Sequence, residues 1–192
     1  SSSDIPHWFS KSRFSIFIVA RWWEHFTNKK SPLIWVPDYF CDESLEILRS
    51  KKYSIHFYPI KNDLLPDWER CYLDAQVNKP DIFILVHYFG KPSAIKKTRE
   101  FCDQFQAIFL EDAAHVLKPF DDIGTLSDFV LYSQYKFFTI PDGALLVQRK
   151  ITKNHWLDHN MDSNKSMTEA MNHLPKKSPG TIGWLMKKVA LK

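Results

Sequence analysis

The chain has little glycine, little cysteine and no long apolar run. Only 5 of its 192 residues are glycine, and none of them forms a glycine-rich loop of the kind that binds nucleotide phosphates. A plain nucleotide-binding α/β domain is therefore the last of the functions we consider. The three cysteines, Cys41, Cys71 and Cys102, are odd in number and widely spaced, which excludes a disulfide framework and a zinc knuckle. We expect reduced thiols in a cytoplasmic protein.

A strong excess of one charge is missing as well. Lysine and arginine total 26 against 22 acidic residues, a net charge of +4. The basic residues occur in scattered pairs such as Lys51-Lys52 and not in a stripe, so we expect no nucleic acid partner. The apolar run 14–20 is closed by Arg21 and Glu24 and is too short to span a bilayer. We therefore expect no membrane partner.

Apolar and aromatic residues are plentiful, at 44% and 15% of the chain. This composition excludes a disordered protein and is typical of a packed globular domain. The 7 tryptophans, 15 phenylalanines and 7 tyrosines supply more aromatic surface than a small domain readily buries. Because interfaces are enriched in such residues, we expect a homodimer or a larger assembly.

Short apolar runs alternate with helical patterns along the chain. The pattern predicts strands at 33–36, 53–58, 81–86, 107–110, 129–132 and 144–147, and helices at 13–26 (with Ser12 as its cap), 43–52, 67–77, 91–105 and 167–173. This alternation favours an α/β fold, a mostly parallel sheet with helices on both faces. Only residues 133–143 separate the last two strands, too few for a helical crossover, so that pair is expected to be antiparallel.

Four polar side chains follow two of these predicted strands within one short segment. Asp112 and His115 come after the strand at 107–110, and Ser133 and Lys136 come after the strand at 129–132. Ligands of open α/β sheets bind beyond the carboxyl ends of the strands. A lysine, a carboxylate and a hydroxyl in this arrangement suit the binding of pyridoxal phosphate (PLP), which needs an imine-forming amine, a partner for the ring nitrogen and a phosphate ligand.

At these residues the chain resembles the DegT-type sugar aminotransferases, which are PLP enzymes of the aspartate-aminotransferase fold (fold type I). The segment EDAAH at 111–115 is similar to the family's EDAA(Q/H) motif. The element HYFGKP at 87–92 resembles its H-x-x-G-x-P element, and WVPDYFC at 35–41 resembles the strand end that places an aromatic ring beneath the cofactor. The match extends from about Ser12 to Val147.

The resemblance implies a role for each of these positions. Lys136 and Asp112 would be catalytic, Lys136 forming the internal aldimine and Asp112 holding the pyridine nitrogen protonated. His115 would lie near the phenolic oxygen, and Phe40, or less favourably Tyr39, would stack on the ring. Ser133 and the helix start at Ser12 and Arg13 would bind the phosphate, because a helix N-terminus favours an anion.

The resemblance also implies a function and a domain arrangement. The expected reaction is transfer of an amino group from a donor to a small-molecule keto substrate, a nucleotide-linked or related sugar. Residues 1–150 would form the PLP-binding large domain, and residues 151–192 a helical tail or the start of a C-terminal segment, with the family's small C-terminal domain truncated or missing. The alternative is a non-catalytic domain of the same fold that serves partner binding or assembly.

Each of these residues also has an ordinary structural interpretation. Lys136 alone would be read as a surface lysine lying over aromatic rings, Asp112 as a helix cap, His115 as a core histidine and Ser133 as a strand-end hydroxyl. His87 is expected to order a loop and not to take part in chemistry. His155 and His159 have the i, i+4 spacing of metal ligands, but no third ligand is near them, so we expect no metal site.

Overall fold

Strands and helices alternate along the computed structural model, which describes residues 4–149 and 162–174. The strands are β1 (Ile5–Phe9), β2 (Leu33–Pro37), β3 (Ser54–Tyr58), β4 (Ile82–Val86), β5 (Ile108–Ala113), β6 (Phe129–Tyr132) and β7 (Ala144–Gln148). The helices are α1 (Ser12–Thr27), α2 (Asp42–Ser50), α3 (Trp68–Ala75), α4 (Ile95–Phe105) and α5 (Ser163–Met171), with short 3-10 turns η1 (Tyr88–Gly90) and η2 (Gln134–Lys136).

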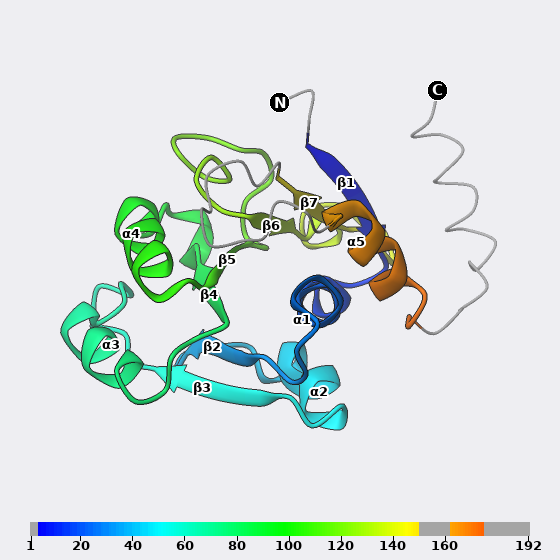
Figure 1. The fold of residues 1–192 in the computed structure, drawn as a ribbon. Coiled ribbons are helices and arrows are strands. Elements are labelled where there is room, and N and C mark those ends of the chain that lie inside the picture. Colours follow the sequence, from blue (N-terminus) through cyan, green and yellow to red (C-terminus); the bar gives the residue numbers. More distant parts are fainter. Residues whose placement is uncertain (1–3, 150–161, 175–192) are drawn as a thin grey trace.

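The seven strands form one sheet in the order β1-β7-β6-β5-β4-β2-β3 (Figure 1). The pairs β2/β3, β2/β4, β4/β5 and β5/β6 are parallel, whereas β7 is antiparallel to both β6 and β1. The predicted fold class, including the antiparallel last pair, is therefore confirmed. Because β4, β5 and β6 are adjacent and parallel, the loops that follow them meet at one end of the sheet.

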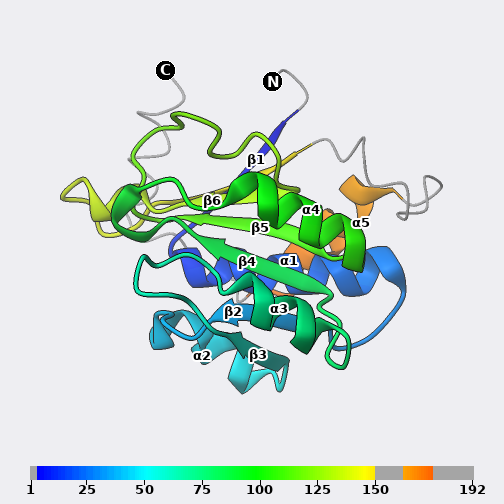
Figure 2. The same ribbon diagram turned by 90° about the vertical axis from the view of Figure 1, so that its left-hand side faces the viewer.

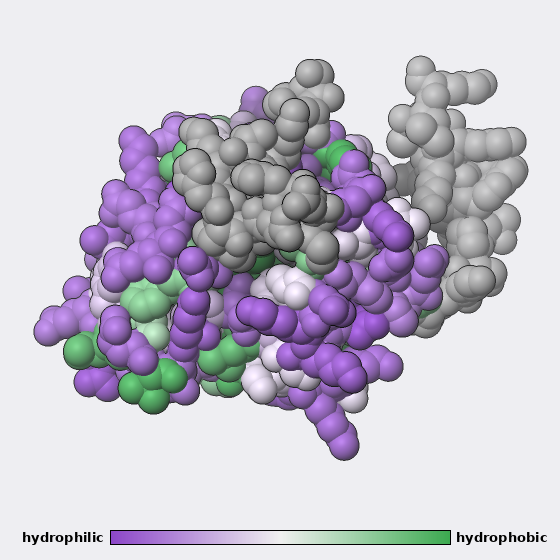
Figure 3. Space-filling view, viewed as in Figure 1, coloured by the Kyte–Doolittle hydropathy of each residue, from purple (hydrophilic) through white to green (hydrophobic). Residues whose placement is uncertain are grey.

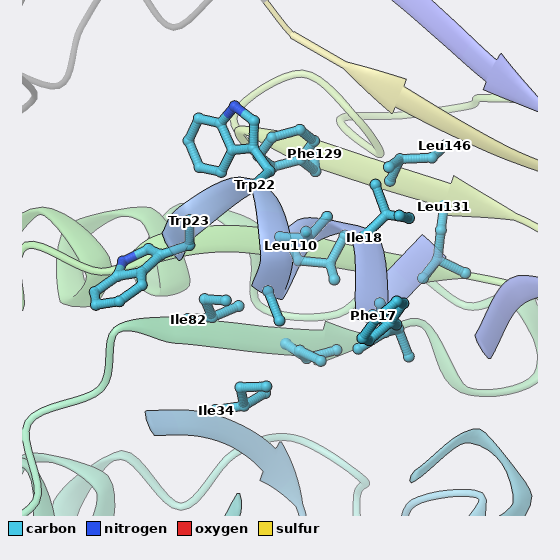
Figure 4. Close-up of a cluster of buried hydrophobic side chains, with 14 of the residues drawn as sticks. Phe17, Ile18, Trp22, Trp23, Ile34, Ile82, Leu110, Phe129, Leu131 and Leu146 are labelled. Carbon is cyan, nitrogen blue, oxygen red and sulfur yellow. The ribbon is translucent and has the colours of Figure 1, made fainter. Parts of the chain in front are cut away.

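Helices cover both faces of the sheet. Helices α1, α2 and α5 lie on one side and α3 and α4 on the other (Figures 1 and 2). Apolar side chains from α1 pack against β2, β4, β5, β6 and β7 to form one core, labelled in Figure 4. A second core on the other face contains the buried aromatic residues Trp35, Tyr58, Phe83 and Phe101. The described residues on the face shown in Figure 3 are mainly hydrophilic, with small hydrophobic groups between polar residues.

Three predictions of local structure were wrong. Strand β1 was missed, because its Pro6 lacks an N–H and the segment becomes a strand only through pairing with β7. Helix α4 begins at Ile95 and not at Lys91. The cap position of α1 is held by Lys11, whose side chain makes no capping bond, and Ser12 is the first helical residue.

Helix α5 contributes Met167 and Ala170 to the core beneath α1. The proposed division at residue 150 stays a prediction, since 150–161 and 175–192 lie outside the described residues, as do His155 and His159. Within the described part of the chain, no helix is long and apolar enough to cross a membrane. The three cysteines are all free thiols.

Candidate functional site

The loops that follow β4, β5 and β6 gather at one end of the sheet, beside the start of α1 (left in Figure 2). Two backbone and side-chain contacts hold the β6–β7 loop against this helix start. The Gly143 N–H donates to the Ser10 carbonyl at 3.1 Å, and Lys11 Nζ donates to the Pro141 carbonyl at 2.8 Å. Side chains from distant parts of the sequence therefore meet at this end.

Asp112 lies inside β5, one residue before its end. Leu110 and Ala114, two positions before and after Asp112, both pack in the core on the α1 side of the sheet. Alternate residues of a strand face the same side, so Asp112 faces the α1 side too. Its Oδ1 accepts a hydrogen bond from the Ala114 N–H at 2.9 Å. Loss of surrounding water raises the pKa of the Asp112 carboxyl, and this effect is partly offset by the Ala114 N–H and the positive charge of Lys136.

Lys136 and His115 are in direct contact. Lys136 lies at the end of η2, and its Nζ is 3.2 Å from His115 Nε2. Desolvation and the neighbouring Lys136 charge lower the pKa of His115, so the imidazole is neutral at pH 7 and its Nε2 can accept a hydrogen bond from the Lys136 ammonium group. The sequence placed these two residues 21 positions apart; the fold brings them together with Asp112.

Ser133 is fully buried at the end of β6, and its Oγ has no hydrogen-bond partner among the described residues. Buried hydroxyl groups are normally paired, so this oxygen is available for a ligand. Ser12 and Arg13 form the first turn of α1. The Arg13 guanidinium contacts Glu43 and Glu46, each at 3.2 Å, so its charge is already engaged by α2.

The two candidates for the aromatic ring that stacks on the cofactor, Phe40 and Tyr39, differ in their burial and in their neighbours. Phe40 is half-buried against the core on the α1 side of the sheet, the side that Asp112 faces. Tyr39 is 61% exposed and stacks on Tyr88 with ring centroids 5.7 Å apart. The fold thus places Phe40, and not Tyr39, on the face that carries the other candidate residues.

Sequence analysis missed Glu111. Its side chain is completely buried on the opposite face of the sheet, and its Oε2 accepts hydrogen bonds from His87 Nε2 at 2.7 Å and from the Gly124 N–H at 3.0 Å. A glutamate that directly follows the apolar run Ile108–Leu110 and still lies inside the strand was a signal, because a charged residue in a buried strand needs a partner. The predicted loop-ordering role of His87 agrees with its ring accepting the Ser93 N–H.

Gly90 should be far less tolerant of alanine than Gly124. Both glycines have left-handed backbone angles, with φ of +77° and +76°, so the strain of alanine is matched. At Gly90 an added Cβ would lie 2.6 Å from the His115 carbonyl oxygen, a backbone atom, whereas at Gly124 it would meet side-chain atoms at 3.2 and 3.3 Å. We expect Gly90→Ala to cost about 2–3 kcal/mol and Gly124→Ala about 1–2 kcal/mol.

Denaturant unfolding of the two variants and the wild type measures this difference. An equal loss in both would mean that the contact between Gly90 and His115 has no energetic consequence.

Comparison with known proteins agrees with the expected family. Residues 73–162 match the sequence model of the DegT/DnrJ/EryC1/StrS aminotransferase family. No curated protein matches the sequence significantly.

Three solved structures illustrate the similarity of fold. PseC of Helicobacter pylori, an aminotransferase of pseudoaminic acid biosynthesis, has a TM-score of 0.65 at 17% identity, over 90% of this chain and 45% of its own. For 3-amino-5-hydroxybenzoic acid synthase the TM-score is 0.68 at 11% identity, over 93% and 45%. NtdA of Bacillus subtilis, solved with bound PMP, has a TM-score of 0.62 at 16% identity, over 74% and 32%.

The chain spans less than half of the length of these three proteins. Within that span the sheet and its covering helices are those of the PLP-transferase large domain. The resemblance to the DegT-type aminotransferases is therefore confirmed, by the family's sequence model over residues 73–162 and by the fold.

Proposed function

We propose that this chain is the PLP-binding part of an aminotransferase that delivers an amino group to a keto substrate, a nucleotide-linked or related sugar. The observation that carries the proposal is the meeting of Lys136, His115 and Asp112 at one end of the sheet. The substrate class is supported by PseC and by DesI, a matching structure determined in the presence of its TDP-sugar product. The bound PMP of NtdA supports the cofactor.

The residues at this end suit PLP chemically. The unpartnered, buried Oγ of Ser133 and the first turn of α1 offer a hydroxyl and a helix N-terminus to a phosphate. Because Glu43 and Glu46 engage the Arg13 side chain, we assign the contribution of Ser12 and Arg13 to the helix start and not to the guanidinium. A desolvated carboxyl at Asp112 suits a pyridinium partner, because a protonated ring nitrogen would restore the favourable surroundings that burial removes.

When bound, PLP supplies the electron sink that lets an amino group leave a donor and enter a keto substrate. Asp112 would keep the ring nitrogen protonated. Lys136 would hold the cofactor and would be the base that moves the proton between the reacting carbon atoms. Neutral His115, which contacts Lys136, would hydrogen-bond near the phenolic oxygen of the cofactor, and Phe40 would stack on its ring.

The proposal is tested by the visible absorbance of purified protein mixed with PLP. We expect a new band that appears at one equivalent of PLP and disappears when a suitable amino acid from a panel of donors is added. Keto sugar nucleotides should restore the band by taking up the amino group. No band with excess PLP would contradict the proposal and favour the non-catalytic alternative.

We also propose that the chain assembles as a homodimer through the rim of this site. Large apolar side chains on the loops around the site are exposed: Tyr39, Phe89, Leu117, Phe120, Phe137 and Phe138. Exposed apolar groups clustered in this way are typical of interaction surfaces. Placing them against a second copy would remove them from water and shield the site.

Introducing two negative charges into the apolar rim should dissociate the dimer into monomers. Leu117→Asp with Phe120→Asp changes side chains that are 48% and 41% exposed, so the fold should tolerate it. The matched control is Leu73→Asp with Val77→Asp, 59% and 84% exposed, at α3. Sedimentation should show a dimer for wild type and control and a monomer for the rim variant. A monomeric wild type at high concentration would contradict the assembly.

A further inference from the structure

A hydrogen-bonded polar pair is buried behind the candidate site, on the face of the sheet opposite Asp112. Both side chains, Glu111 and His87, have no solvent exposure, and Glu111 Oε2 lies 2.7 Å from His87 Nε2. On the other side of the ring, the Ser93 N–H donates to Nδ1 at 3.1 Å. Because Nδ1 accepts this hydrogen bond, the ring hydrogen is on Nε2, and Nε2–H donates a hydrogen bond to Glu111.

The backbone of His87 contacts the candidate site directly. Its N–H donates to the Asp112 carbonyl at 3.0 Å. His87 thus links the end of β4 to two consecutive residues of β5, through a side-chain hydrogen bond to Glu111 and a main-chain hydrogen bond to Asp112. Any rotation of the Asp112 main chain would have to break the His87 contact.

The turn η1 that follows His87 contacts three further parts of the site. The Tyr88 hydroxyl donates to the Tyr39 carbonyl, next to Phe40. The Phe89 ring lies parallel to the His115 ring, with centroids 6.3 Å apart and 15° between planes. Gly90 approaches the His115 carbonyl so closely that an added Cβ would lie 2.6 Å from its oxygen. Phe89 itself has an unusual positive φ of 54°, so tertiary contacts hold the turn.

A packing role alone does not account for Glu111. Its Oε1 is buried and has no hydrogen-bond partner among the described residues, which is costly compared with an apolar pair of the same volume. The hydrogen bond between Glu111 and His87 fixes the direction of the His87 ring, and hence of the turn, which an apolar pair would not do.

We infer that His87–Gly90, anchored by Glu111, form a positioning clamp that fixes Asp112 and His115 for the cofactor. The role of the clamp in holding the cofactor rests on the proposed function. Its geometry rests on hydrogen bonds that are present without any cofactor. His87 and Glu111 are positioning residues: they act through Asp112 and His115 and do not touch the reacting atoms.

Two substitutions at His87 separate its two ring contacts. The amide nitrogen of His87→Gln can reach Glu111 as Nε2 does, whereas the oxygen of His87→Asn can only accept the Ser93 N–H as Nδ1 does. A third variant, His87→Phe with Glu111→Leu, removes both polar groups at similar volume and should fold even if a single variant does not. The control is Trp35→Phe, which loses the indole bond to the Asn78 carbonyl on the same face, away from the site.

The first measurement is amide exchange of Ala114 by NMR in cofactor-free protein, because its N–H donates to the Asp112 carboxylate. We expect exchange to become about 10-fold faster in His87→Asn and in the double variant, and to change little in His87→Gln and Trp35→Phe relative to amides elsewhere in the sheet. The second measurement is the dissociation constant for PLP. We expect it to rise about 10-fold or more in His87→Asn and in the double variant, and less than about 3-fold in His87→Gln and Trp35→Phe.

Unchanged Ala114 exchange and PLP affinity in the folded double variant would overturn the clamp. Equal losses in His87→Gln and His87→Asn would overturn the assignment of the anchor to Glu111. If the wild type failed to bind PLP, the proposed function would fall, but the exchange of Ala114 would still decide whether the clamp exists.

Discussion

Replacing Lys136 with alanine should abolish amino transfer while leaving the protein folded. Lys136 is exposed at the end of η2, so its loss should change the free energy of unfolding by less than about 0.5 kcal/mol. The reaction loses both the group that holds PLP and the group that moves the proton, so the rate of amino transfer should fall by at least about 10⁴-fold. Donor-dependent product formation and the visible band of the PLP complex measure the effect.

The control for this experiment is Lys91→Ala, in the loop after β4. Lys91 is also exposed, and within the described part of the chain no hydrogen bond or ion pair joins its side chain to His115 or Asp112. Activity that survives in Lys136→Ala, or that is lost to the same extent in Lys91→Ala, would remove Lys136 from the mechanism.

Asp112→Asn should have opposite effects on stability and on activity. Burial raises the pKa of Asp112 above its ordinary value of 3.8, so the folded, cofactor-free protein accommodates the charged form of this carboxyl less well than the unfolded chain does. An asparagine removes that charge and still accepts the Ala114 N–H. We expect a gain of about 1 kcal/mol, or about 2–4 °C in melting temperature. Amino transfer should fall by at least about 10³-fold, because the ring nitrogen loses the partner that keeps it protonated.

The pH dependence follows from the direction of the shift. A raised carboxyl pKa means that the folded state binds the proton more tightly, so the cost is full above the folded pKa and disappears as the pH falls below 3.8. The stability gain of Asp112→Asn should therefore shrink on acidification and vanish at the lowest pH. Melting curves of cofactor-free protein between neutral and acidic pH follow this trend.

Asp128→Asn is the contrasting control. Its carboxylate is also buried, but it is paired with Arg99 at 3.1 Å and accepts the Phe109 N–H at 2.7 Å. Removing the negative charge of Asp128 leaves the positive charge of the largely buried Arg99 without part of its partner charge. We expect this to destabilise the protein by about 2–3 kcal/mol. A loss of stability in Asp112→Asn similar to that in Asp128→Asn would indicate that Asp112 is a structural carboxylate.

The sequence predicted the sheet well because buried parallel strands are marked by local apolar runs. The strand Phe129–Tyr132 was predicted to the residue, and the separation of 133–143 alone indicated the antiparallel turn into β7. The edge strand Ile5–Phe9 was not predicted, because its stability comes from β7, more than a hundred residues away. The start of α4 was misplaced since tertiary contacts of Ser93 with His87 compete with the first helical turn.

The candidate site was predictable in its residue types and only partly in its geometry. The apolar runs in the sequence predict where the strands end. Because Asp112 and Lys136 lie at or after the carboxyl ends of neighbouring parallel strands, the sequence also predicts that they lie at the same edge of the sheet. Contacts across the fold are not marked locally: neither the bond between Lys136 and His115 nor the engagement of Arg13 by α2 has a signal in the sequence. The contact between Glu111 and His87 was missed for the same reason, although a glutamate inside a buried strand already marked the need for a partner.

The central claim is that Lys136 is the lysine that holds PLP, and mass mapping of the reduced complex tests it most directly. Wild-type protein is mixed with PLP, reduced with borohydride, digested and mapped by mass spectrometry. We predict one modified lysine, in the peptide that contains Lys136, and no modification when excess borohydride is added before PLP. A cofactor fixed on another lysine, or spread over several surface lysines at equal yield, would contradict the assignment.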